Sequence, residues 1–285
     1  MDDRLVSLSD RGMLRLWRNH HKYCGETIEI DEVLADCIAT AERTGWRMCR
    51  MLPGAACGLP AFVRKSSGGA LDAMRCLYIS TGIHGDEPAG PLAALCLLQQ
   101  DNWPENLSLV LCPCLNPDGF ELNTRGNSAG IDLNRQYRRP RAFETAAHIH
   151  WLRGQPAFDL ALCLHEDWES AGFYVYELNP DGLPSLAEDI VAAAGKVCPI
   201  DRSEKIEGWA ARDGIIRPAV DPEASSDWPE AFYLLRNKTR LCYTLEAPSD
   251  YPLCIRTAAL VEGVRAAVRM IAVSGAAQEG AGREE

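Results

Sequence analysis

The chain has 285 residues, of which 47% are hydrophobic and 24% charged, and its formal net charge is −11 at pH 7. This length and composition are sufficient for a sizeable core, and we expect a single domain over residues 1–285. The acidic excess argues against a nucleic-acid or anionic-membrane partner, because both bind clustered lysines and arginines. No apolar run approaches the ~20 residues that span a bilayer.

The amino-terminal region, residues 1–50, predicts a mainly helical extension. Residues 1–10 carry acids where a secretory signal needs a basic region followed by an apolar one, so we expect a cytoplasmic protein. The twelve cysteines fit this expectation, because many lie in apolar contexts such as residues 94–98 and 160–164. We therefore interpret them as small core residues rather than as a disulfide framework.

Four apolar segments predict the strands of a central sheet, and helical segments separate or follow them. The predicted strands are 75–80, 107–115, 158–164 and 240–246, and the predicted helices are 92–99, 141–152, 183–197 and 251–273. This alternation is typical of a mixed, mostly parallel α/β sheet with helices on both faces. Residues 201–230 are rich in Gly and Pro, which predicts irregular structure. We expect the residues that select the substrate side chain to lie in this segment. Residues 274–285 predict a frayed tail.

Ionisable residues stand at the ends of three predicted strands. His84 and Glu87 follow the first strand, His165 follows the third, and Glu246 ends the fourth. Because the carboxyl ends of parallel strands share one edge of a sheet, we expect these side chains to lie together. Two histidines and a glutamate form a known zinc site with an open position for water. The alternative roles are a turn residue for His84, an acid at a helix amino terminus for Glu87 and a buried core histidine for His165.

A polar loop between the second and third strands carries further candidates. The tetrapeptide 116–119, Asn-Pro-Asp-Gly, predicts a turn, and the loop 120–139 after it is long enough to be functional. The loop contains Arg125, Asp132, Asn134 and Arg135. Arginine binds carboxylates through two parallel hydrogen bonds, which favours an anionic substrate. The alternatives are surface salt bridges for the arginines and a loop cap for Asp132.

Taken in this order, these residues resemble the active-site series of the carboxypeptidase A-like zinc metallopeptidases. The chain is most similar to their compact bacterial branch, which includes the murein tripeptide amidases. The resemblance implies a zinc carboxypeptidase-like α/β/α fold. It also implies one Zn²⁺ per chain, held by His84, Glu87 and His165.

The resemblance also implies a role for each remaining candidate. Glu246 would activate the zinc-bound water, and Arg125 would stabilise the negative oxygen that develops on the substrate. Asn134 and Arg135 would bind a substrate carboxylate, and Asp132 would hold the first zinc histidine in the correct tautomer. Glu166 is a rival base, but a neighbour in a strand points to the opposite face. Tyr233 is a candidate for the mobile, substrate-facing tyrosine of the digestive enzymes.

The implied activity is that of a zinc metallocarboxypeptidase or peptide amidase. Its substrate would be a small peptide with a free carboxylate next to the scissile amide, including peptides derived from the cell wall. The alternative is an N-acyl amino acid deacylase of the succinylglutamate desuccinylase/aspartoacylase group, which shares the two zinc histidines, the glutamate and the Asn-Arg pair. The tetrapeptide 116–119 and the position of Glu246 favour the peptidase. A third hypothesis is a binding protein that retained the fold without activity.

Overall fold

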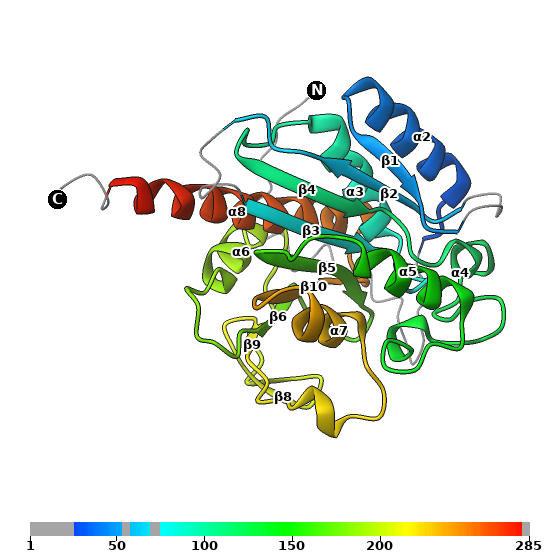
Figure 1. The fold of residues 1–285 in the computed structure, drawn as a ribbon. Helices are drawn as coiled ribbons and strands as arrows, with labels where there is room; N and C mark the ends of the chain where they lie inside the picture. Colours follow the sequence, from blue (N-terminus) through cyan, green and yellow to red (C-terminus); the bar gives the residue numbers. More distant parts are fainter. Residues whose placement is uncertain (1–25, 53–57, 69–74, 281–285) are drawn as a thin grey trace, which may run out of the picture.

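The structure is a computed structural model that describes residues 26–52, 58–68 and 75–280, with side chains up to residue 272. Figure 1 shows one central sheet with helices on both of its faces. The strands of this described part are β1 Arg47–Arg50, β2 Pro60–Arg64, β3 Arg75–Thr81, β4 Leu107–Cys112, β5 Leu160–Asp167, β6 Tyr174–Leu178, β7 Lys205–Ile206, β8 Trp209–Arg212, β9 Ile215–Ile216 and β10 Cys242–Pro248.

The helices alternate with these strands along the chain. They are α2 Ile30–Arg43, α3 Ala89–Gln100, α4 Pro117–Leu122, α5 Phe143–Arg153, α6 Ala187–Ala194, α7 Glu230–Asn237 and α8 Leu253–Gly280, and two 3₁₀ turns, η3 and η4, cover Leu133–Arg135 and Pro222–Ala224. Within the described ranges, none of these helices has the length and apolar character needed to span a membrane.

The described strands form one sheet in the order β1-β2-β4-β3-β5-β10-β6-β9-β8-β7. The central strands β4, β3, β5 and β10 pair in parallel. Antiparallel pairs lie toward both edges, β1 with β2 on one side and β6 with β10 on the other. The predicted α/β class is therefore confirmed, with a parallel centre and antiparallel strands toward each edge.

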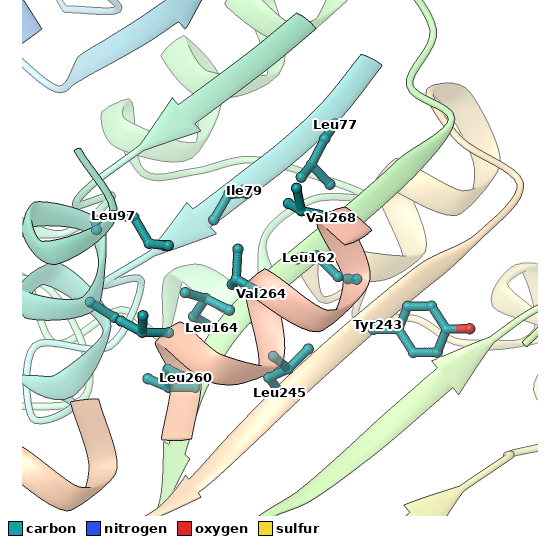
Figure 2. Packing of buried hydrophobic residues seen from close by; sticks show 14 of the residues in the cluster. Leu77, Ile79, Leu97, Leu162, Leu164, Tyr243, Leu245, Leu260, Val264 and Val268 are labelled. Carbon is teal, nitrogen blue, oxygen red and sulfur yellow. The ribbon is translucent and has the colours of Figure 1, made fainter. Parts of the chain in front are cut away.

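Successive residues of each strand point to opposite faces of the sheet. On one face, Leu77 and Ile79 of β3 and Leu245 of β10 pack against α3 and α8, as Figure 2 shows. On the other face, Tyr78 of β3 and Cys163 of β5 pack beneath α5 and α7. Full burial of one such aliphatic side chain contributes about 1.5–3 kcal/mol, so both faces stabilise the sheet. The second face also carries the ionisable residues at the strand ends.

Several element boundaries differ from the prediction. Residues 47–50, expected within a mainly helical region, form β1 and pair with β2. A four-residue strand is too short to leave a periodic pattern, and the helical expectation for residues 1–25 lies outside the described residues. Helix α8 continues to Gly280, beyond the predicted end at 273, because this stretch contains Ala and Gln, which propagate helices. The expectation for residues 281–285 also lies outside the described part.

The predicted turn at residues 116–119 begins a short helix, α4. Asn116 caps it, since its side-chain oxygen accepts a hydrogen bond from the backbone N–H of Gly119, and Pro117 occupies the first helical position. The polar loop therefore starts at Asn123, after the helix has ended. Its place between β4 and α5 is as the sequence predicts.

Candidate active site

His84 and Glu87 lie in the turn between β3 and α3, which packs closely against the start of α4. A Cβ atom on Gly85 would lie 1.9 Å from the carbonyl carbon of Gly119, so glycine is required for this approach. The Asn116 amide donates a hydrogen bond of 3.1 Å to the backbone oxygen of Ile83. These contacts fix the turn that presents the imidazole and the carboxylate.

His84, Glu87 and His165 form the candidate metal site. The Glu87 carboxylate lies between the two imidazoles, with Oε1 2.5 Å from Nδ1 of His84 and Oε2 3.0 Å from Nδ1 of His165. One ligand atom from each residue lies within 4.8 Å of the others, and all three side chains are buried. Burial alone raises the pKa of Glu87, but the imidazoles outweigh it and hold that pKa below its ordinary value.

This donor set fits a divalent metal ion. Two nitrogen donors and one carboxylate converge within the distance that a single ion can bridge, which is the ligand chemistry of catalytic zinc. The buried Nε2 of His84, the ring nitrogen away from the cluster, lies 3.4 Å from Oδ1 of Asp132. A carboxylate at this second nitrogen holds the tautomer that leaves Nδ1 for the metal.

Arg125 connects this carboxylate to the metal cluster. Its Nε donates to Oδ2 of Asp132 at 3.0 Å, and its Nη1 lies 3.8 Å from Oε1 of Glu87. Burial raises the pKa of Asp132, but His84 and Arg125 reverse this and lower the pKa below its usual value. Arg125 is about half exposed, so its guanidinium borders both the cluster and the open cavity.

Glu246 lies beside the cluster on the adjacent strand. In the register of β10, it is paired with His165 of β5 on one side and with Tyr174 of β6 on the other. Directly paired residues project from the same face of a sheet, so the Glu246 carboxylate and the His165 imidazole share the cavity. Burial raises the pKa of Glu246 well above its ordinary value, and His165 opposes this rise.

Asn134 and Arg135 lie on the 3₁₀ turn η3 and line the same cavity, whose volume is about 700 Å³. Oδ1 of Asn134 accepts a hydrogen bond of 2.8 Å from the backbone N–H of Glu230, so its amide group remains available as a donor. The side chain of Arg135 donates to the backbone oxygen of Asn134 at 2.9 Å. The structure thus brings all eight predicted site residues to one region.

Glu230, which the sequence reasoning did not identify, holds the Asn134 turn in place against strand β3. Its buried carboxylate accepts hydrogen bonds from the hydroxyls of Tyr78 at 2.7 Å and Ser80 at 2.8 Å. It therefore joins α7, the Asn134 turn and strand β3 in one network. An acid at the start of a helix resembles an ordinary capping residue, so the sequence contained no specific signal for this role.

The side chains of two other ionisable residues are held by structural contacts. The Glu166 carboxylate forms an ion pair with the buried Arg256 and accepts a hydrogen bond of 2.6 Å from the backbone of Ala89. His148 is buried between the hydroxyls of Tyr78 and Tyr137. The placement of Glu166 agrees with its interpretation as the weaker base, and the two tyrosine contacts of His148 give it a structural role.

Tyr233 is buried on α7 with its ring 5.9 Å from that of Tyr137, and it does not line the cavity. It therefore does not have the position expected of a substrate-facing tyrosine. Two other tyrosines, Tyr174 and Tyr176, do line the cavity from β6. Their alternation with Val175 and Glu177 is the period-two pattern of a strand, and this signal could have identified them.

A second hollow, of about 730 Å³, lies between α6 and β9 and includes Ile200 and Lys196. None of the predicted site residues lines it. The candidate chemistry is therefore confined to the cavity at the carboxyl ends of β5 and β10.

The described fold is a carboxypeptidase-like fold. The chain shares its fold with a candidate metallopeptidase from Shewanella denitrificans, with a TM-score of 0.74 and 22% identity over 89% of this chain and 99% of that one. It also shares it with carboxypeptidase A from Helicoverpa armigera, with a TM-score of 0.61 and 14% identity over 87% of this chain and 74% of that one.

Residues 73–199 match the family model of the succinylglutamate desuccinylase/aspartoacylase catalytic domain. A segment of 125 residues is 32% identical to carboxypeptidase SOL1 of Arabidopsis thaliana, and the match covers 34% of this chain and 24% of SOL1. The chain thus matches about a quarter of the length of this curated relative. The predicted resemblance of this chain to carboxypeptidase-like metallopeptidases and to the desuccinylase/aspartoacylase group is confirmed.

Proposed function

We propose that this protein is a zinc-dependent hydrolase that cleaves an amide bond next to a free carboxylate in a small peptide. The observation that carries the proposal is the pairing of His165 with Glu246 across β5 and β10, which brings a metal ligand and a carboxylate base to one cavity. Zinc bound by His84, Glu87 and His165 would polarise the scissile carbonyl and make a water molecule more acidic.

The residues around the metal site would perform the proton transfers and the binding. The Glu246 carboxylate would accept a proton from the attacking water and return it to the departing amine nitrogen. The half-exposed Arg125 guanidinium would stabilise the oxygen that becomes negative in the transition state, which in comparable sites contributes about 3–4 kcal/mol.

Substrate selection would depend on the other end of the cavity. The Asn134 amide and the exposed Arg135 guanidinium would bind the carboxylate of the leaving amino acid. Peptides from the cell wall, such as γ-D-glutamyl-diaminopimelate, present this arrangement. The net negative charge of the chain and its cavity volume favour a small substrate rather than a nucleic acid or a membrane.

The second candidate function is an N-acyl amino acid deacylase. The match of residues 73–199 to the desuccinylase/aspartoacylase catalytic domain favours it. That match includes the three metal ligands but ends before β10, so it does not contain Glu246. The two functions would share the same metal chemistry and differ only in the acyl group that they accept.

A two-part experiment tests the proposal. Zinc-loaded protein is assayed against a panel of small peptides and against succinyl- and acetyl-amino acids, with release of the free amino acid as the measured product. Peptide cleavage is expected, and turnover of acyl-amino acids alone would favour the deacylase. The Glu246→Gln variant should bind zinc with wild-type stoichiometry yet lose about 10²–10⁴-fold in kcat. Unchanged kcat would remove Glu246 from the mechanism.

A further inference from the structure

Glu166 directly follows the metal ligand His165 on β5, so its side chain projects from the opposite face of the sheet, the face that packs against α3 and α8. The residue borders the cavity, yet its side chain is fully shielded from solvent. Burial raises the pKa of Glu166, and the ion pair with Arg256 opposes this rise. The proton transfers proposed for Glu246 do not involve this acid, and its contacts lead instead to the turn that carries Glu87.

Two hydrogen bonds connect Glu166 to the segment of Glu87. The backbone N–H of Glu166 donates at 3.2 Å to Oε2 of Glu87, the oxygen that also lies 3.0 Å from Nδ1 of His165. The carboxylate of Glu166 accepts a hydrogen bond of 2.6 Å from the backbone N–H of Ala89, the first residue of α3. One residue therefore holds both the carboxylate of a metal ligand and the chain just after that ligand.

The carboxylate of Glu166 caps helix α3 from a neighbouring strand. The first backbone N–H groups of a helix have no partner within the helix. The residue before α3 is Pro88, whose side chain makes no capping hydrogen bond, and the first turn of α3 contains no acid. Glu166 supplies the missing acceptor, and its negative charge suits the positive end of the helix dipole. The start of α3, and with it the turn of Glu87, is thus fixed to β5.

Arg256 of α8 balances the charge of this carboxylate. Its Nη1 forms an ion pair with Oε2 of Glu166, and neither side chain is exposed to solvent. Ser249, which directly follows β10, donates its hydroxyl to the same oxygen at 3.1 Å. Removal of two charged groups from water is costly, and an apolar pair of similar volume is often at least as stable. Stability alone therefore does not account for a buried ion pair at this position.

We propose that Glu166 is a positioning residue for the metal carboxylate of Glu87, with Arg256 as its counter-ion. The backbone N–H of Glu166 orients one oxygen of Glu87, and its side chain fixes the turn from which Glu87 projects. Through Ser249, the same carboxylate ties the end of the strand that carries Glu246 to this turn. The inference rests on the metal site of the proposed function and gives Glu166 no contact with the substrate.

Glu166→Gln tests this role, because glutamine has nearly the same size but no charge to pair with Arg256. Zinc affinity should fall by about tenfold or more in competition with a chelator, although all three ligands are intact, because Glu87 is held less well. At saturating Co²⁺, the visible absorption spectrum of the bound ion should also change, because it depends on the geometry of the ligands. A contribution to stability alone would leave this spectrum unchanged.

Glu177→Gln is the matched control. Glu177 is also a buried acid on a strand, and it pairs with Arg217 at 2.6 Å and accepts a hydrogen bond of 3.0 Å from the Tyr243 hydroxyl. None of its described contacts is with a metal ligand. The replacement should lower the free energy of unfolding but keep the wild-type zinc affinity and cobalt spectrum.

A wild-type zinc affinity or a wild-type cobalt spectrum in Glu166→Gln would overturn the inference and leave the zinc hydrolase proposal intact. The same changes in Glu177→Gln would also overturn it, because they would show a general effect of lost stability.

A double variant covers the case in which Glu166→Gln does not fold because the charge of Arg256 is left unpaired. Replacement of both residues by methionine, Glu166→Met with Arg256→Met, removes both charges and should restore folding, since methionine adapts to irregular space. This variant should still bind zinc about tenfold or more weakly than the wild type. Wild-type zinc affinity in the double variant would refute the positioning role.

If the wild type binds neither zinc nor cobalt, the proposed function fails, and amide hydrogen exchange of the metal-free protein decides on the positioning role. The backbone N–H groups of Ala89 and Glu166 should then exchange about tenfold or more faster in Glu166→Gln than in the wild type, because the start of α3 opens more often. Faster exchange that is absent in Glu177→Gln supports the role, and unchanged exchange refutes it.

Discussion

Replacement of Gly85 by alanine should damage the metal site without changing a ligand. The added Cβ would lie 1.9 Å from the carbonyl carbon, 2.3 Å from the carbonyl oxygen and 2.4 Å from the Cα of Gly119. Carbon atoms in contact stay about 3.5–4.0 Å apart, so the two turns must separate by about 1.5–2 Å. Such overpacking costs about 1–3 kcal/mol, and loss of the Asn116–Ile83 hydrogen bond adds about 1 kcal/mol.

The free energy of unfolding should therefore fall by about 2–4 kcal/mol. Because His84 and Glu87 flank this position, part of the loss should appear as weaker zinc binding. Thermal unfolding of the zinc-free and zinc-loaded protein measures both effects, and the stabilisation by zinc should be smaller in the variant. Gly154→Ala is the control, because its φ of −81° suits alanine and its Cβ would meet nothing closer than 3.5 Å. Wild-type unfolding and zinc affinity in Gly85→Ala would refute the proposed packing of the two turns.

Three further predictions concern the residues around the site. Asp132→Asn should weaken zinc binding by about 10–100-fold in competition with a chelator, because the second nitrogen of His84 loses its carboxylate, and an unchanged affinity would contradict this role. Arg135→Lys should raise KM for substrates with a free carboxylate more than it lowers kcat, because lysine cannot form the two-pronged contact; steady-state kinetics would exclude that role if KM stayed constant. Burial lowers the pKa of His148 from 6.5 to about 3, so between these pH values the unfolded chain binds a proton that the folded protein does not. The free energy of unfolding should therefore decline as the pH falls from 6.5 toward 3, by about 2 kcal/mol at pH 5. Urea unfolding at several pH values should show that the free energy of unfolding declines less steeply with falling pH in His148→Gln than in the wild type. The same pH dependence in both proteins would contradict this role of His148.

The sequence predicted the ligand cluster because its signals were local. His84 and Glu87 lie in one turn, and His165 and Glu246 each lie in or directly after an apolar run long enough to be recognised as a strand. Their convergence then followed from the parallel order of the central strands. The Asn-Arg pair and Arg125 depended instead on the family resemblance, since single arginines in a polar loop have no distinctive pattern.

The residues that line the cavity from the β7–β8 hairpin could not be predicted, for two physical reasons. Strands β7, β8 and β9 have two to four residues each, which is too short to show periodicity. The orientation of Glu207 and Trp209 depends on how this hairpin packs on Tyr174, a contact between segments far apart in the chain. Glu230 was missed for a related reason, because its partners Tyr78 and Ser80 lie on β3.

The position of β10 in the sheet has a consequence for the order in which the centre is assembled. Strands β3 and β5 pair directly, so the three ligands can meet once the ribosome has delivered residue 165. Glu246 arrives later, when β10 inserts between β5 and β6. In the proposed function, the residues that would hold the metal are therefore translated before the residue that would act as the base.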